Sequence, residues 1–234
     1  MRVYNFSAGP AMLPLPALER AQAELTDWQG LGMSVMEVSH RSKAFIACAA
    51  HAEQALRDLM LIPDSYRVLF LQGGATGEFA AAPMNLTAPG ERVAYLKTGS
   101  WSAKAIAAAR AQQVTVDVSA DEAASKYTTV PAPDSFAVGA DAVYLHYTPN
   151  ETIGGVEFGY LPDSGGAPLV ADMSSTILSQ PVDVSQYGVI YAGAQKNMGP
   201  AGLCVVIVRE DLLGKARPTT PAVLDWAQMA AADS

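Results

Sequence analysis

Short apolar runs separated by helical patterns predict an α/β fold for this chain. Seven runs rich in β-branched and aromatic residues are expected to form strands, at residues 68–71, 93–96, 114–118, 143–147, 169–171, 189–191 and 204–208. Most of these runs are continuously apolar, which is typical of strands that are covered on both faces. The pattern therefore predicts one α/β domain with a mostly parallel central sheet and helices on both faces.

Helical spacing of apolar residues predicts four helices around these strands. Residues 16–28 and 43–60 each place apolar side chains on one face, and two further helices are expected over 78–85 and 101–112. The stripe on 43–60 includes Phe45, Cys48, Ala52, Leu56 and Leu59. Residues 215–221 are expected to form a loop, and the chain is expected to finish without a closing structural element.

Composition and charge exclude several classes of protein. The 234 residues carry a formal net charge of −8 and no basic run, which argues against a nucleic-acid partner. No segment has the length of a membrane span, and the opening lacks the apolar stretch of a signal peptide, so a cytoplasmic location is expected. The only two cysteines, Cys48 and Cys204, lie in apolar patterns and are expected to be core residues. They provide neither a disulfide framework nor zinc-ligand spacing, and no metal site is predicted.

A lysine and an aspartate follow two of the predicted strands. Asp172 closely follows the run at 169–171, and Lys196 follows the run at 189–191. Pyridoxal phosphate needs an amine for a Schiff base and a carboxylate beside its pyridine nitrogen. Parallel strands present their carboxyl ends at one edge of a sheet, where both side chains could meet this cofactor. On spacing alone, a solvated Lys196 and a turn-capping Asp172 are equally good interpretations.

Five motifs occur together along the chain in a characteristic order. They are NFSAGP at 5–10, EVSHR at 37–41, HYTPNET at 146–152, ADMSS at 171–175 and GAQKNMGPAG at 193–202. In this combination the chain closely resembles the phosphoserine aminotransferases. The resemblance implies the fold-type-I architecture, a homodimer and dependence on pyridoxal 5'-phosphate. It also implies amino-group exchange between phosphoserine with 2-oxoglutarate and 3-phosphohydroxypyruvate with glutamate, in serine biosynthesis. Many bacterial members also act on the 4-phosphohydroxythreonine pair of pyridoxine biosynthesis.

The resemblance assigns catalytic and cofactor-binding roles to individual residues. It implies that Lys196 holds the cofactor covalently and later moves a proton, that Asp172 pairs with the pyridinium, and that Trp101 stacks on the ring. On sequence alone, a core aromatic is the other interpretation of Trp101. Thr152 and Gln195 would complete the contacts around the ring.

The loop at 73–77, Gly-Gly-Ala-Thr-Gly, would bind the cofactor phosphate. It lies between a predicted strand and a predicted helix, and backbone amides at a helix N-terminus favour an anion. The amides of Ala75 and Thr76 and the Thr76 hydroxyl would supply the contacts, because some relatives have an Arg in place of Thr76. The loop lacks the Gly-Lys-Ser/Thr ending of a nucleotide-binding P-loop.

The resemblance places substrate recognition near both the beginning and the missing end of the family sequence. His40 and Arg41 would bind the substrate, since an Arg fork pairs well with a carboxylate or phosphate. The segment 1–15, with Ala8 where relatives often have Ser, would lie near the substrate. Residues 16–234 would form the cofactor-binding large domain. Full members continue into a small domain with further substrate contacts, so weak cofactor retention and little turnover are expected of this chain.

Two alternatives to an active phosphoserine aminotransferase remain. One is a non-catalytic cofactor domain. The other is a different fold-type-I enzyme, such as a serine–glyoxylate aminotransferase or a cysteine desulfurase. A desulfurase would need an exposed reactive cysteine, whereas both cysteines of this chain lie in apolar patterns.

Overall fold

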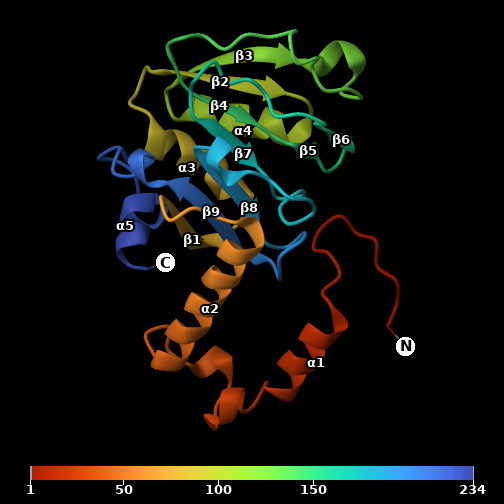
Figure 1. The fold of residues 1–234 in the computed structure, drawn as a ribbon, viewed down its shortest axis with the longest axis vertical. Coiled ribbons are helices and arrows are strands. Elements are labelled where there is room, and N and C mark those ends of the chain that lie inside the picture. Colours follow the sequence, from red (N-terminus) through yellow and green to blue (C-terminus); the bar gives the residue numbers. More distant parts are fainter. Residues whose placement is uncertain (1, 234) are drawn as a thin grey trace.

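A seven-stranded sheet forms the centre of the computed structural model, which describes residues 2–233 (Figure 1). Met1 and Ser234, the outer bounds of the two predicted segments, lie outside the described residues. The strand order is β1-β9-β8-β7-β4-β2-β3, and only β9 runs antiparallel to its neighbours. The strands are β1 (Tyr66–Gly73), β2 (Arg92–Lys97), β3 (Thr115–Asp121), β4 (Ala142–Tyr147), β7 (Leu169–Asp172), β8 (Val189–Gly193) and β9 (Gly202–Arg209). Each of the seven predicted runs overlaps one of them, so the predicted sheet is confirmed.

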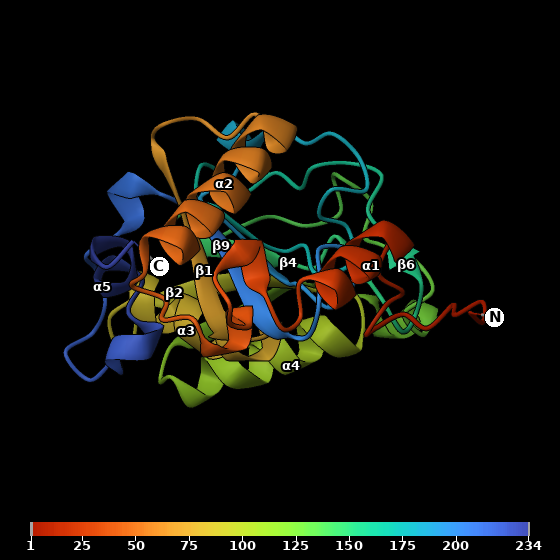
Figure 2. The same cartoon turned by 90° about the horizontal axis from the view of Figure 1, so that it is seen from below.

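Helices cover both faces of this sheet, as predicted. Figure 2 shows α2 (Lys43–Met60) on one side and α3 (Ala75–Leu86) with α4 (Ser100–Ala111) on the other. The side chains between the sheet and α3 and α4 form one buried apolar cluster, to which Trp226 also belongs. The continuous apolar runs reflect this arrangement, because all five residues of β8 are buried.

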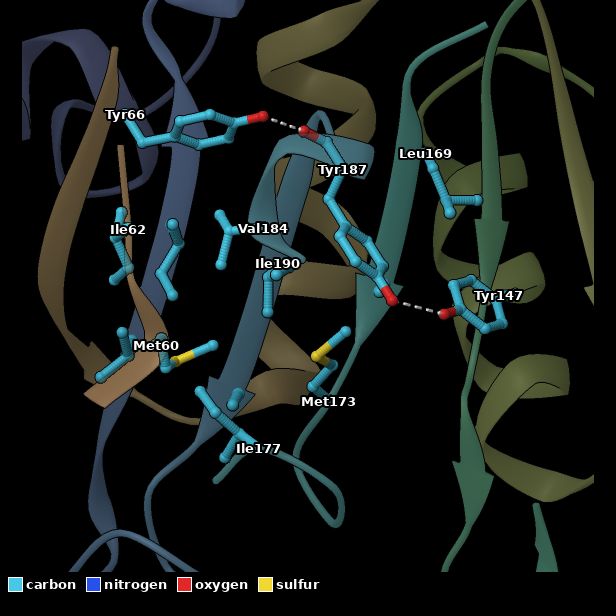
Figure 3. Packing of buried hydrophobic residues seen from close by; sticks show 14 of the residues in the cluster. Met60, Ile62, Tyr66, Tyr147, Leu169, Met173, Ile177, Val184, Tyr187 and Ile190 are labelled. Atoms are coloured by element: carbon cyan, nitrogen blue, oxygen red, sulfur yellow. Dashed lines mark hydrogen bonds between the residues drawn. The ribbon is translucent and has the colours of Figure 1, made fainter. Parts of the chain in front are cut away.

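The opposite face of the sheet carries a second core that includes hydrogen-bonded phenols (Figure 3). Tyr66 Oη donates to the Tyr187 carbonyl oxygen at 2.6 Å, and the hydroxyls of Tyr147 and Tyr187 lie 3.2 Å apart. These bonds satisfy polar atoms that would otherwise be desolvated without a partner. From α2, only Leu56 and Met60 at its end are buried in this core.

The N-terminal helix is shorter than the predicted 16–28. α1 (Leu15–Ala23) ends before Trp28, which is buried in a separate 3-10 turn, Trp28–Gly30, and packs on Phe45 with ring centroids 6.5 Å apart. The Asp27 side chain accepts a hydrogen bond from the Gly32 amide at 2.6 Å. Such a local side-chain bond stabilises a loop in place of continued helix.

Helix α2 has the predicted bounds, but the expectation that Cys48 is a core residue is wrong. Cys48 is exposed, and so is Leu59 on the same predicted stripe. The reason is that α2 extends away from the sheet (Figure 1), and only Leu56 and Met60 near its C-terminus are buried. Cys204 in β9 is fully buried, as predicted.

The chain also has a terminal helix that the sequence interpretation missed. α5 (Trp226–Ala231) follows Asp225, whose side chain accepts hydrogen bonds from the amides of Ala227 and Gln228. Trp226 is fully buried and donates through Nε1 to Glu78 of α3 at 3.1 Å. The expected absence of a closing element is therefore wrong, and the aspartate cap was a usable signal for this helix.

The remaining elements are short. β5 (Asn150–Glu151) and β6 (Val156–Glu157) form a small antiparallel hairpin, and further 3-10 turns occupy Val35–Glu37, Glu122–Ser125, Val184–Gln186, Glu210–Leu212 and Ala222–Leu224. Among the helices described, none combines the length and the apolar character required to cross a membrane.

Candidate active site

Five strands deliver candidate residues to one edge of the sheet. β2, β4, β7 and β8 are mutually parallel, and β1 points the same way because both β1 and β8 are antiparallel to β9. Their carboxyl ends therefore lie together, as the sequence predicted. This is the edge at which open α/β sheets bind ligands.

Asp172 is the last residue of β7 and is held from one side. Its Oδ1 accepts hydrogen bonds from the Ser174 amide at 3.0 Å and the Ser174 hydroxyl at 2.6 Å. The Gly193 amide at the end of β8 donates in turn to Ser174 Oγ at 3.1 Å. Burial raises the pKa of Asp172, while the Ser174 hydrogen bonds and the Lys196 charge oppose the increase. Both hydrogen bonds reach Oδ1, and no hydrogen bond to Oδ2 is found within residues 2–233.

Lys196 lies in the turn that follows β8, beside Asp172. Its Nζ donates to Thr152 Oγ1 and lies 5.2 Å from the centroid of the Trp101 ring. Burial lowers the pKa of Lys196, whereas the carboxylates of Asp172 and Glu151 act in the opposite direction. A partly buried amine with a lowered pKa is a better nucleophile than a solvated surface lysine.

Trp101 is the second residue of α4, and its amide is held by a residue that the sequence interpretation did not select. Glu151 is only 1% exposed, and its carboxylate accepts from the Trp101 amide at 2.8 Å, the Ser102 amide at 2.8 Å and the Ser102 hydroxyl at 2.6 Å. Lys104 Nζ lies 4.3 Å from the Trp101 ring centroid. The half-buried Trp101 therefore packs against the apolar cluster beneath α3 and α4 and also lies beside the Lys196 amine.

The predicted phosphate loop opens α3. Gly73 has a φ of +104°, a conformation that favours glycine, and Gly74 precedes the helix without a side chain to cap it. Ala75 is half-buried and Thr76 is exposed. Within residues 2–233, no side chain accepts a hydrogen bond from the first-turn amides of α3. The Gly77 amide donates to the Gly74 carbonyl oxygen at 2.9 Å, whereas no acceptor is found in residues 2–233 for the amides of Ala75 and Thr76. Unpaired amides at a helix N-terminus can bind an anion.

The N-terminal segment lies against the site residues. The Ala11 amide donates to the Gln195 carbonyl oxygen at 2.8 Å. A Cβ placed on Gly9 would lie 3.2 Å from Lys196 Cγ, so the backbone passes directly over the lysine. Ala8 is exposed and adjoins Gly9, whereas Gln195 is half-buried beside Lys196.

His40 and Arg41 are not brought to this site within one chain. Both are exposed and precede α2, at the end of that helix that points away from the sheet (Figure 1). No hydrogen bond or ion pair in the described part of the chain links their side chains to Lys196 or Asp172. Their assignment to substrate binding stays a prediction.

Sequence reasoning missed two residues that organise the site. Ser174 follows Asp172 by two positions, a local turn pattern that could have been recognised. Glu151 lies about fifty positions from the helix that it contacts, and no local pattern indicates that contact.

The fold places an amine and a carboxylate at the carboxyl edge of an α/β sheet, which is where sheets of this class bind ligands. A family model for class-V aminotransferases matches residues 3–223. The chain belongs to the class-V aminotransferase family.

Particular relatives are similar over nearly the whole chain. Phosphoserine aminotransferase of Azotobacter vinelandii is 57% identical over 225 residues, covering 96% of this chain and 62% of that protein. The solved phosphoserine aminotransferase of Bacillus circulans subsp. alkalophilus has a TM-score of 0.95 at 47% identity and covers all of this chain and 64% of its own. A pyridoxal-phosphate-bound phosphoserine aminotransferase of Trichomonas vaginalis has a TM-score of 0.91 at 42% identity, covering 99% and 65%. This chain spans less than two thirds of the length of these relatives.

Proposed function

We propose that this chain is the cofactor-binding part of a pyridoxal-phosphate-dependent phosphoserine aminotransferase. The observation that carries the proposal is the joint placement of Lys196 and Asp172 at the ends of β8 and β7, with Trp101 beside the amine. Relatives more than 50% identical carry this name, and amino-group transfer between phosphoserine and 2-oxoglutarate is the corresponding reaction.

The residues at this edge fit pyridoxal phosphate in several independent ways. Asp172 offers Oδ2 to a protonated ring nitrogen, and Lys196 offers an amine. Trp101 offers an aromatic face, and its Nε1 is buried without a hydrogen-bond partner among the described residues. The uncapped N-terminus of α3 offers amides to a phosphate. The cofactor would supply an aldehyde for covalent capture of an amine and a ring that accepts electrons.

The protein's own residues would position the cofactor and control the protonation of its ring nitrogen and of the substrate carbon. Asp172 keeps a ring nitrogen charged, because a buried carboxylate favours the protonated form of an adjacent base. Thr152 orients Lys196, whose amine, once free, can move a proton at the substrate carbon. The amides of Ala75 and Thr76 hold the phosphate, and Gln195 and the segment around Ala8 border the site.

A homodimer is part of this proposal, supported by the exposed apolar surface of the N-terminal helices. Leu15 and Leu18 of α1 and Ile46 and Leu59 of α2 are all exposed. An apolar surface of this kind is typical of a protein–protein interface. In such an assembly, His40 and Arg41 would serve a site formed with the second copy, which accounts for their distance from Lys196 in one chain.

A cysteine desulfurase receives no support from the cysteines. Cys204 is buried in β9, and burial raises the pKa of its thiol, which disfavours the reactive thiolate. Cys48 is exposed, but it lies on the part of α2 that extends away from the sheet.

Covalent labelling tests the proposal. The chain is incubated with pyridoxal phosphate, reduced with borohydride and mapped by peptide mass spectrometry, and the label is expected on Lys196. Lys196→Ala should lose the label, whereas Lys104→Ala should keep it. Transfer from phosphoserine to 2-oxoglutarate is assayed separately, on unreduced chain saturated with pyridoxal phosphate, because reduction blocks the Lys196 amine permanently. A label on Lys97 or Lys104 in the parent chain would refute the assignment of Lys196.

A further inference from the structure

The N-terminus of α4 lacks a capping side chain of its own at the first position. Gly99 stands where Ser, Thr, Asp or Asn usually accepts the free amides of the first turn. The Glu151 carboxylate, from the β5–β6 hairpin, accepts from two of these amides, on Trp101 and Ser102. The first turn of α4 is thus held by a residue from another element.

Because Glu151 is buried, its carboxylate depends on these hydrogen bonds, which hold it and the first turn of α4 in one arrangement. A carboxylate that is 1% exposed has lost its hydration, and a buried charge persists only when hydrogen-bonded or paired. Within the described part of the chain, the hydrogen bonds of the Glu151 carboxylate go to Trp101 and Ser102. A Cβ on Gly99 would come within 2.6 Å of Glu151 Cδ, so glycine is needed there to admit the carboxylate.

Glu151 also connects the aromatic ring to the amine. The next residue, Thr152, accepts a hydrogen bond from Lys196 Nζ, and Nζ lies over the Trp101 ring. Two consecutive residues of the hairpin therefore fix the ring and the amine relative to each other. The hairpin is itself paired, with Asn150 opposite Glu157 and Glu151 opposite Val156.

We propose that Glu151 is a positioning residue that holds the Trp101 ring in register with Lys196 and so sets how an aromatic ligand stacks between them. The inference rests on the proposed function for the identity of that ligand, pyridoxal phosphate. It does not make Glu151 a catalytic residue, because its carboxylate contacts α4 and not the amine.

The test compares Glu151→Gln with Glu157→Gln, an exposed glutamate of the same hairpin. Amide hydrogen exchange at Trp101 and Ser102, measured without cofactor, should accelerate at least tenfold in Glu151→Gln, since the amide keeps the shape but loses the charge. With pyridoxal phosphate added, Lys196 should still be labelled. The circular dichroism of the cofactor absorption band should fall by half or more, because the ring environment is less ordered. Glu157→Gln should match the parent in all three measurements.

The outcomes separate this inference from the proposed function. If the parent fails to label at Lys196, the proposed function fails, and exchange at Trp101 and Ser102 still decides whether Glu151 fixes α4. If Lys196 is labelled but Glu151→Gln retains parent-like exchange or dichroism, the positioning role is wrong. A change in melting temperature alone, with parent-like dichroism, also overturns it. If Glu151→Gln does not fold, Ser102→Ala removes the 2.6 Å hydroxyl contact with Glu151, along with the bonds of that hydroxyl to Thr98 and Gly99. Because the Glu151 bonds to the Trp101 and Ser102 amides remain, exchange at Trp101 should change in the same direction but less than in Glu151→Gln, and parent-like exchange and dichroism would overturn the positioning role.

Discussion

The N-termini of α3 and α4 lie at the same edge of the sheet, but only the amides of α4 are hydrogen-bonded by a side chain of the described residues. The helices follow β1 and β2, two strands that point the same way, and each helix is preceded by a glycine that cannot cap it. At α4 the free amides are occupied by Glu151. At α3 no side chain of the described residues takes that place, and Thr76 is exposed. Both are potential anion sites, and the chain fills one with its own carboxylate.

A buried glutamate lies near each helix N-terminus, but only one of the two glutamates binds the amides there. Glu78 lies in the first turn of α3, yet it accepts a hydrogen bond from Trp226 of α5 and leaves the helix terminus free. Glu151 lies far from α4 in sequence and occupies that helix's terminus. An acidic residue near a helix start in the sequence is therefore a poor guide to which terminus is closed. The tertiary fold determines which helix terminus binds a carboxylate, because it sets where each glutamate side chain lies.

Closing the α3 terminus should have the largest effect. Thr76→Glu places a carboxylate at an uncapped helix start, where it favours the helix but repels phosphate. Losing several charge-assisted contacts should weaken pyridoxal phosphate binding on the order of a thousandfold, about 4 kcal/mol. Absorbance titration of the chain measures this, with pyridoxal, which lacks the phosphate, as the matched ligand. An equal loss for both ligands would show that the α3 terminus does not hold phosphate.

Replacing the glutamate of α3 should change the pH dependence of stability. Burial raises the pKa of Glu78 from 4.5 to about 7, so the folded chain keeps a proton that the unfolded chain has already released. The contribution of this group to stability is full below about pH 4.5 and is lost as the pH rises to about 7. The loss over this window is at most on the order of 3 kcal/mol.

Urea denaturation between pH 4.5 and 7.5 checks this effect. Glu78→Gln keeps an oxygen for Trp226 Nε1 and should lose most of the decline in unfolding free energy across the window. Exposed Glu157→Gln should decline as the parent does. Matching slopes for the parent and Glu78→Gln would contradict a proton held on Glu78.

The smallest predicted effect concerns the fit of Glu151 against α4. Gly99→Ala should destabilise the chain by about 1–2 kcal/mol, because the new methyl overlaps the carboxylate and the backbone there is extended, not strained. In the Glu151→Ala background this cost should vanish, which a double-mutant cycle measures. Gly77→Ala in α3, where a Cβ would have no neighbour within 4 Å, is the control and should be neutral or stabilising. An unchanged cost in both backgrounds would mean that Glu151 does not set the spacing at Gly99.

Much of the fold could be predicted because its signals are local. The apolar runs identify the seven strands, and the 3.6-residue pattern gives α2 its bounds. The same pattern misplaced Cys48, since an apolar stripe says that a face is to be covered but not by which chain. The pattern also overextended α1, where the Asp27 side chain competes with the helix.

The sequence by itself determined which strands Asp172 and Lys196 follow, and so predicted one edge of a parallel sheet at which the two side chains could meet. Only the tertiary structure decided which helix terminus is closed and that His40 and Arg41 lie apart from Lys196 in one chain. The physical reason is the separation along the sequence between the residues that interact. Strand and helix periodicity are properties of neighbouring residues, whereas the contacts of Glu151 with α4 span about fifty positions and exist only once β4, the hairpin and α4 are packed.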